Sequence, residues 1–178
     1  MRKRGAAARM ALCGVLAALA VALMFLGGTV PFASIACPVL ASLVLIPVYC
    51  ECGWKWGLLW YAAVAALAAL LAPEKEAAVL FAFFGYYPML RKLIGRLRVR
   101  AAAWAVKLVY VNAAVFAAYG LMLYVFHLTA VMEDFEGMGK AMLAVLLVLA
   151  NVTFVIYDVL IARLEIYYHV RLRPKLHL

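Results

Sequence analysis

The sequence predicts an all-α fold, namely a polytopic integral membrane bundle of six transmembrane helices. Of its 178 residues, 71% are hydrophobic and 14% are charged, and the mean hydropathy is +1.07. Soluble domains are about half apolar and about a quarter charged, so this chain would leave much apolar surface facing water. Six apolar runs are also long enough to cross the hydrocarbon core of a bilayer. We therefore expect residues 1–178 to form a single six-helix transmembrane domain.

The first half of the chain holds three predicted spans, at residues 10–26, 30–49 and 54–71. The basic start MRKRGAAARM, followed by an apolar run, is also typical of a secretory signal peptide. Because five further apolar segments follow, we interpret the first run as a retained helix. The second span contains Pro38 and Pro47, which predict kinks, and the third ends before Pro73.

The second half of the chain holds three more predicted spans, at residues 77–94, 101–128 and 141–164. Gly85 and Pro88 lie within the fourth span and predict a kinked or unwound helix there. Tyr86 and Tyr87 lie between them and offer hydroxyl groups and flat faces to a small molecule. A packed, kinked helix without a ligand would have the same sequence.

The charges predict which side of the membrane each loop occupies. Of the 17 Lys and Arg residues, 15 fall at the termini, in the loops after the second and fourth spans, and at the start of the fifth span. By the positive-inside rule that side is cytoplasmic, so we expect a multi-pass cell membrane protein with both termini in the cytoplasm. The net charge of +9 is then explained by topology and anionic lipid head groups rather than by nucleic acid. The opposite loops carry the acidic residues Glu74, Glu76, Glu133, Asp134 and Glu136.

Polar residues inside the predicted spans mark candidate functional positions, because burying them in hydrocarbon costs free energy. Asn112 lies near the middle of the fifth span and Asn151 near the middle of the sixth. They could form hydrogen bonds between helices, which would hold the bundle together, or they could contact a ligand. The outer residue Glu74 has two interpretations as well, since it could cap the fourth helix or bind a cationic or hydrogen-bonding solute.

Lys107 and Asp158 lie at similar depths near the cytoplasmic ends of the fifth and sixth spans. Opposite charges at matching depth on consecutive helices suggest a structural ion pair. The alternative is that each side chain extends separately to the membrane interface.

The sequence contains no catalytic motif, so we expect no enzyme activity, no catalytic residues, no cofactor and no metal site. Cys13 and Cys37 lie in apolar runs, where a thiol behaves as a small hydrophobic group. Cys50 and Cys52 flank Glu51 in what we predict to be a short cytoplasmic loop. A Cys-x-Cys pair alone is a weak indication of a metal site, because zinc usually takes four ligands.

The first span carries small residues on one stripe, which would let another helix approach closely. Because the chain is rich in alanine, the pattern has little specificity. The stripe consists of Gly14, Ala18 and Ala22, and Ala7 and Ala11 form another AxxxA pattern nearer the cytoplasm.

Together these features resemble the S components of energy-coupling factor (ECF) transporters, which are bacterial substrate-binding membrane subunits. The resemblance implies that the chain captures a vitamin-like solute from outside and docks on a transmembrane coupling subunit that carries cytoplasmic ATPases. It also implies that the small residues of the first helix meet the coupling subunit. The implied pocket is formed by residues 27–31, Glu74, Tyr86, Asn112 and Asn151.

Two other classes of function remain open at this point. A structural or assembly membrane protein would use the same polar residues only to join helices. A small membrane enzyme acting on lipids is disfavoured, because the sequence lacks clustered His and Asp residues and a catalytic Ser motif.

Overall fold

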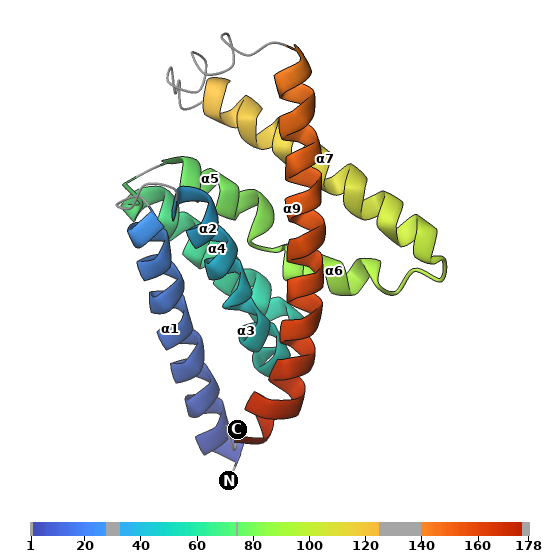
Figure 1. Cartoon of the computed structure of the whole chain (residues 1–178). Helices are drawn as coiled ribbons and strands as arrows, with labels where there is room; N and C mark the ends of the chain where they lie inside the picture. Colours follow the sequence, from blue (N-terminus) through green and yellow to red (C-terminus); the bar gives the residue numbers. More distant parts are fainter. Residues whose placement is uncertain (1, 28–32, 74, 125–139, 176–178) are drawn as a thin grey trace. The chain divides into compact units, whose positions relative to one another are not determined.

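The chain is an all-α, multi-pass membrane protein. The computed structural model describes residues 2–27, 33–73, 75–124 and 140–175, and within those ranges the regular secondary structure is helical, without strands (Figure 1). In that part of the chain, six helical spans are long and apolar enough to cross a membrane. They are Ala7–Gly27, Ile35–Cys52, Trp54–Leu71, Lys75–Ile94, Arg100–Ala118 and Ala144–Leu172.

The structure divides into two compact units. The first comprises Met1–Leu90 together with Ile161–Leu178, and the second comprises Arg91–Leu160. The prediction of one domain over residues 1–178 stays a prediction.

The first unit begins with α1 (Arg2–Gly27), α2 (Ala33–Leu43) and α3 (Leu45–Cys52). The last two together form the second predicted span, which is interrupted at Val44. Pro47 explains this break, because proline has no N–H to donate to the carbonyl of the residue four positions earlier. Within the first turn of α3 the missing donor is not needed, so the helix restarts just before the proline.

The third span is α4 (Trp54–Leu71), with the boundaries that the sequence predicts. Gly53 separates α3 from α4 and has a φ of 87°, a conformation that glycine adopts without steric cost. The fourth span consists of α5 (Lys75–Phe84) and α6 (Tyr87–Ile94). The predicted irregularity at Gly85 therefore separates two short helices.

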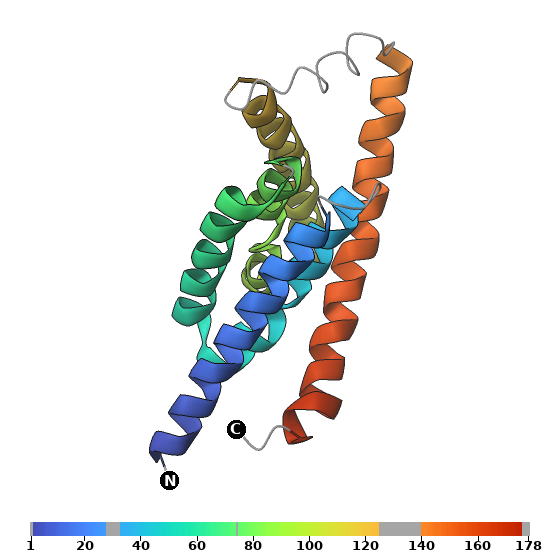
Figure 2. The same ribbon diagram turned by 90° about the vertical axis from the view of Figure 1, so that its left-hand side faces the viewer.

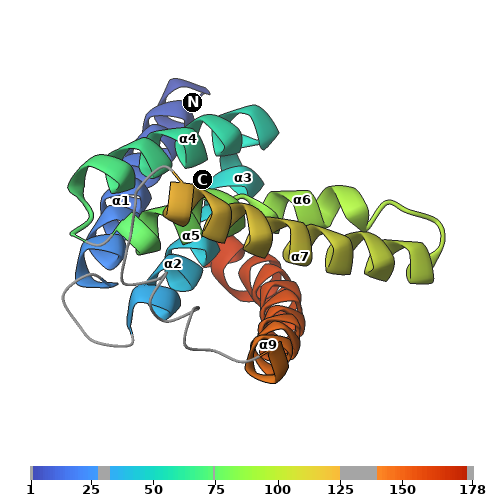
Figure 3. The same ribbon diagram turned by 90° about the horizontal axis from the view of Figure 1, so that it is seen from above.

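The core of the first unit lies where α1, α2, α4 and α5 pack side by side (Figure 2, Figure 3). Met24, Val64 and Phe81 are almost completely buried there. At Gly27, α1 approaches α2 closely, because a Cβ added to this glycine would lie 2.8 Å from the Cβ of Cys37. A glycine on α1 thus lets these two helices approach closely.

The second unit contains α7 (Arg100–Tyr124) and the first three quarters of α9 (Lys140–Tyr167). Beyond Leu160 the helix belongs to the first unit and continues into the π-helix η1 (Tyr168–Leu172) and the 3₁₀ turn η2 (Arg173–Lys175). The sixth span is thus longer than predicted, since it extends to Leu172 instead of ending at residue 164.

Candidate functional site

An amide pair joins α7 to α9 within the second unit. Asn112 Nδ2 donates a hydrogen bond to Asn151 Oδ1 at 3.1 Å, and Asn151 Nδ2 donates to Asn112 Oδ1 at 3.2 Å. Each amide also donates to the backbone carbonyl four residues earlier on its own helix, Leu108 at 2.7 Å and Leu147 at 2.8 Å. The structure therefore brings the two predicted asparagines together as an interhelical contact.

The donors and acceptors of the two side-chain amides can be counted to find which of them are still available. A side-chain amide has two N–H donors and one oxygen with two lone pairs. Both donors of Asn112 and both donors of Asn151 are engaged in the four contacts above, whereas each oxygen accepts one of them. A molecule that bound the pair without breaking it would have to donate hydrogen bonds to these oxygens.

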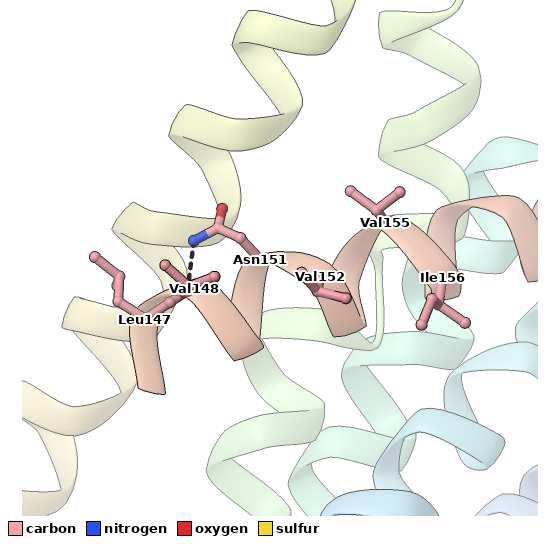
Figure 4. A pocket seen from close by; sticks show the side chains of 6 residues that line it. All are labelled: Leu147, Val148, Asn151, Val152, Val155 and Ile156. Atoms are coloured by element: carbon pink, nitrogen blue, oxygen red, sulfur yellow. Dashed lines mark hydrogen bonds between the residues drawn. The ribbon is translucent and has the colours of Figure 1, made fainter. Parts of the chain in front are cut away.

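Asn151 also borders a hollow on α9. The hollow has a volume of about 400 Å³, and Asn151 is its polar lining residue (Figure 4). The hydrogen bond from Asn151 to Leu147 is the dashed line in that view. Such a lining would contact a ligand mainly through its apolar side chains and orient it through the amide of Asn151. The hollow is lined by Leu147, Val148, Asn151, Val152, Val155 and Ile156.

A buried ionic cluster connects α6, α7 and α9 through side chains of the second unit. Lys107 Nζ lies 2.7 Å from Asp158 Oδ2, so the ion pair that the sequence predicts is present in the structure. Arg91 Nε lies 3.0 Å from Asp158 Oδ1 and adds a second cation that the sequence analysis did not predict. Lys107 Nζ also lies 4.8 Å from the centroid of the Trp104 ring, a cation–π contact. The carboxylate of Asp158 therefore forms ion pairs with both Lys107 and Arg91.

Tyr86 belongs to the first unit and lies among aromatic rings at the break between α5 and α6. Its ring centroid is 5.6 Å from that of Tyr61 in an edge-on arrangement, and Tyr61 is 5.8 Å from Phe81. The Tyr61 hydroxyl donates to the carbonyl of Ala82 in the last turns of α5. This bond satisfies a carbonyl next to the break, so the aromatic cluster stabilises the irregular backbone.

Several predicted positions lie outside the described residues. They are Glu74, residues 28–31, Glu133, Asp134 and Glu136. Beside Glu74, Lys75 Nζ donates to the carbonyl of Ala69 at 2.9 Å and thereby caps the carboxyl end of α4. Glu76 lies in the first turn of α5, where a negative charge is favourable.

The small residues of α1 form an uncovered face. A Cβ added to Gly14 would meet no heavy atom within 4 Å. The opposite face of the helix packs inward, where Ala20 and Met24 are fully buried. The exposed side, called the small-residue face below, consists of Ala7, Ala11, Gly14, Ala18 and Ala22.

A polar cluster that the sequence analysis missed joins the end of α3 to the C-terminal segment in the first unit. The Tyr168 hydroxyl donates to Glu51 Oε1 at 3.2 Å, and Arg173 Nε lies 3.2 Å from the same oxygen. The Tyr49 hydroxyl donates to the carboxylate of Glu165. The apolar runs of the sequence did not indicate this cluster. The predicted sixth span stops just before Glu165, so the residues that follow were not expected to be helical.

The prediction of a loop at residues 50–52 was wrong. Cys50, Glu51 and Cys52 are the last residues of α3, and the turn is confined to Gly53. The helix continues this far because the Glu51 carboxylate is neutralised by Arg173 and hydrogen-bonded by Tyr168, so it is buried at 8% exposure without an unpaired charge.

Comparison with known proteins gives no match to a family model, to a curated protein or to a solved structure.

The described side chains offer hydrogen-bond acceptors and paired charges more than reactive groups. Within residues 2–27, 33–73, 75–124 and 140–175, no three His, Cys, Asp or Glu side chains lie close enough to hold a metal ion. The ionic cluster and the amide pair both connect α7 to α9. The two asparagine oxygens of the amide pair can each accept a further hydrogen bond from another molecule.

Proposed function

We propose that this chain is a membrane substrate-capture subunit, similar to an ECF S component, for uptake of a small solute. It would work with a transmembrane coupling subunit and ATPases, since its sequence has no Walker loop to bind ATP. The observation that carries the proposal is the uncovered small-residue face of α1. A helix that faces only lipid gains little from small residues, whereas a helix that packs against a partner helix needs them.

The charge distribution supports the same proposal. With 15 of the 17 basic residues on one side, both termini and the loop around Arg96 would face the cytoplasm of the cell. The small-residue face would then begin at the cytoplasmic end of α1, close to where ATPases would be coupled. The acidic outer loops would favour a neutral or cationic solute over an anion.

The hydrogen-bonding groups of the amide pair limit the chemistry of the solutes that it could bind. Its donors are occupied and its oxygens are not saturated. A solute recognised at Asn112 and Asn151 would therefore donate hydrogen bonds, as amino, amide or hydroxyl groups do.

The substitution Gly14→Leu tests docking to the coupling subunit. Its side chain would enter open space, so the chain should fold normally, yet it would keep a partner helix from approaching. When the chain is co-expressed with the coupling subunit and ATPases of its own genome, we expect Gly14→Leu to lose most of the copurifying complex. Val15→Leu, at an exposed position beside the small-residue face, is the matched control and should copurify as wild type does. Equal recovery of both variants would disprove the assigned role of this face.

The substitution Asn151→Leu tests solute capture. Mass spectrometry of small molecules that copurify with the wild-type chain identifies the candidate solute, and calorimetry measures its binding. We expect Asn151→Leu to abolish that binding, because the acceptor oxygen is gone. Thr153→Leu changes an exposed polar residue of the same helix and should leave binding unchanged. Wild-type affinity in the Asn151→Leu protein would argue against this site.

The second candidate is a structural or assembly membrane protein, and the mutual saturation of the amide donors favours it. In that case no solute copurifies, and Asn151→Leu only weakens the contact between α7 and α9. The expected loss is about 0.6 kcal/mol and at most roughly 1.7 kcal/mol, the range measured for interhelical hydrogen bonds in membranes.

A further inference from the structure

We propose that Cys13 and Cys52 form an oxidisable dithiol that links α1 to α3 through a disulfide. Cys13 Sγ lies 3.0 Å from Cys52 Sγ, although the two residues are 39 positions apart in the sequence. Both thiols are free and half-buried, so they are protected from bulk solvent but accessible to a small reagent. The inference stands on this contact and does not depend on the proposed transport function.

The surrounding structure holds both cysteines in place. The Trp60 indole Nε1 donates to the backbone carbonyl of Cys13 at 2.9 Å, which fixes that turn of α1 against α4. Cys52 is the last residue of α3, directly before the turn at Gly53. Its sulfur also lies 4.0 Å from the carbonyl of Arg9, one turn before Cys13 on α1. The contact between α1 and α3 therefore brings both thiols to one point.

The geometry also favours a disulfide between Cys13 and Cys52 over one between Cys50 and Cys52, which form the Cys-x-Cys pattern of the sequence. Cys50 Sγ lies 3.7 Å from His169 Nε2, toward the C-terminal segment. Cys50 and Cys52 are two positions apart on a helix, so their side chains point in different directions. Cys37 is buried where α2 meets Gly27 of α1. Cys52 thus has Cys13 as its thiol neighbour.

The reaction is thiol–disulfide exchange with an organic disulfide as the oxidant. The thiolate of one cysteine attacks a sulfur of the reagent and releases one reagent thiol, leaving a mixed disulfide on the protein. The second cysteine then attacks the protein sulfur of that mixed disulfide and releases the second reagent thiol. Cys13 and Cys52 lose two electrons and two protons, which the reagent gains. Only about 1 Å of sulfur movement is needed to reach the S–S bond length.

The consequence is a covalent closure of the segment from Cys13 to Cys52. In the reduced protein, α1 is held to α3 by non-covalent contacts, whereas in the oxidised protein the two helices cannot separate. If α1 docks a partner as proposed above, oxidation would fix the helix that carries the docking face.

The test uses the full-length protein in detergent, treated with one molar equivalent of dithiodipyridine, which supplies oxidant for a single disulfide and leaves the other thiols free. We expect release of two thiopyridone molecules per cross-link, a mass decrease of two hydrogens, and a non-reduced peptide that joins the segments around Cys13 and Cys52. Cys13→Ser and Cys52→Ser should each lose this peptide and retain a mixed disulfide. Cys37→Ser and Cys50→Ser are the matched controls and should still form it.

Two results would overturn the proposal. One is a cross-link between Cys50 and Cys52 in the wild-type protein. The other is a persistent mixed disulfide on Cys13 while Cys52 stays reduced. Because a serine variant could fold poorly, the wild-type protein provides a second measurement: maleimide labelling after oxidation should modify Cys37 or Cys50 but neither member of the pair.

Discussion

Replacing Asp158 with leucine should destabilise the protein by roughly 3–5 kcal/mol, the cost of leaving a buried charge without its partner. Asp158 is 4% exposed and Lys107 is 8% exposed, so water cannot replace the lost carboxylate. Arg91 would lose the same partner, since its Nε lies 3.0 Å from Asp158 Oδ1. The measurement is the free energy of unfolding in detergent micelles, compared between wild type and variant.

Replacing Lys107 with leucine should cost less than the Asp158 substitution, because Asp158 would keep its contact with Arg91. The double substitution Lys107→Leu with Asp158→Leu should cost less than the sum of the two single changes. Arg96→Gln is the control, since Arg96 is exposed, and should change stability by no more than about 0.5 kcal/mol. Simple additivity of the two substitutions would show that the charges do not stabilise each other.

Substituting Gly57 with leucine should also have a large effect, in the first unit. A Cβ at this position would lie 2.9 Å from the Cβ of Tyr49 and 3.1 Å from the sulfur of Met89. The Tyr49 Cβ is fixed by the backbone of α3, so α4 would have to move away. Overpacking of this kind typically costs 1–3 kcal/mol, and a leucine is larger than one added methylene, so we expect at least about 2 kcal/mol.

Gly14→Leu is the matched control for that experiment. Both substitutions place leucine for glycine in an apolar helix, but Gly14 has open space where Gly57 has two neighbours. The control should unfold at the wild-type denaturant concentration or slightly above it, because leucine favours the helix. If both variants were equally destabilised, close approach at Gly57 would not be the cause.

The sequence predicted the helical spans well because the length of an apolar run reports directly on the thickness of the bilayer. The third span is the clearest case, since the predicted range and α4 coincide. The interruption near Gly85 was also predictable from glycine and proline. The extension of α9 was not, because Glu165 interrupts the apolar run, and its contact with Tyr49 could not be predicted from the sequence.

The candidate site was predicted less completely, because depth in the membrane can be estimated from sequence but contacts cannot. Matching depth suggested that Lys107 could pair with Asp158, whereas the contact between Arg91 and Asp158 was not predicted. Matching depth also placed Asn112 and Asn151 at one level. Nothing in the sequence shows that each amide would give its second N–H to its own helix.

The ionic cluster has a consequence for the order in which the protein is made. Arg91 and Lys107 precede Asp158 by 67 and 51 residues, so a ribosome delivers both cations to the membrane well before the carboxylate. Until then, each positive charge must stay hydrated at the interface or within the insertion machinery, because hydrocarbon does not accept it unpaired. The two cations can form their ion pairs only after the helix that carries Asp158 has been inserted. Final packing of the earlier helices is therefore a late step of biogenesis. A ribosome stalled before Asp158 should therefore hold a chain that the insertion machinery has not yet released.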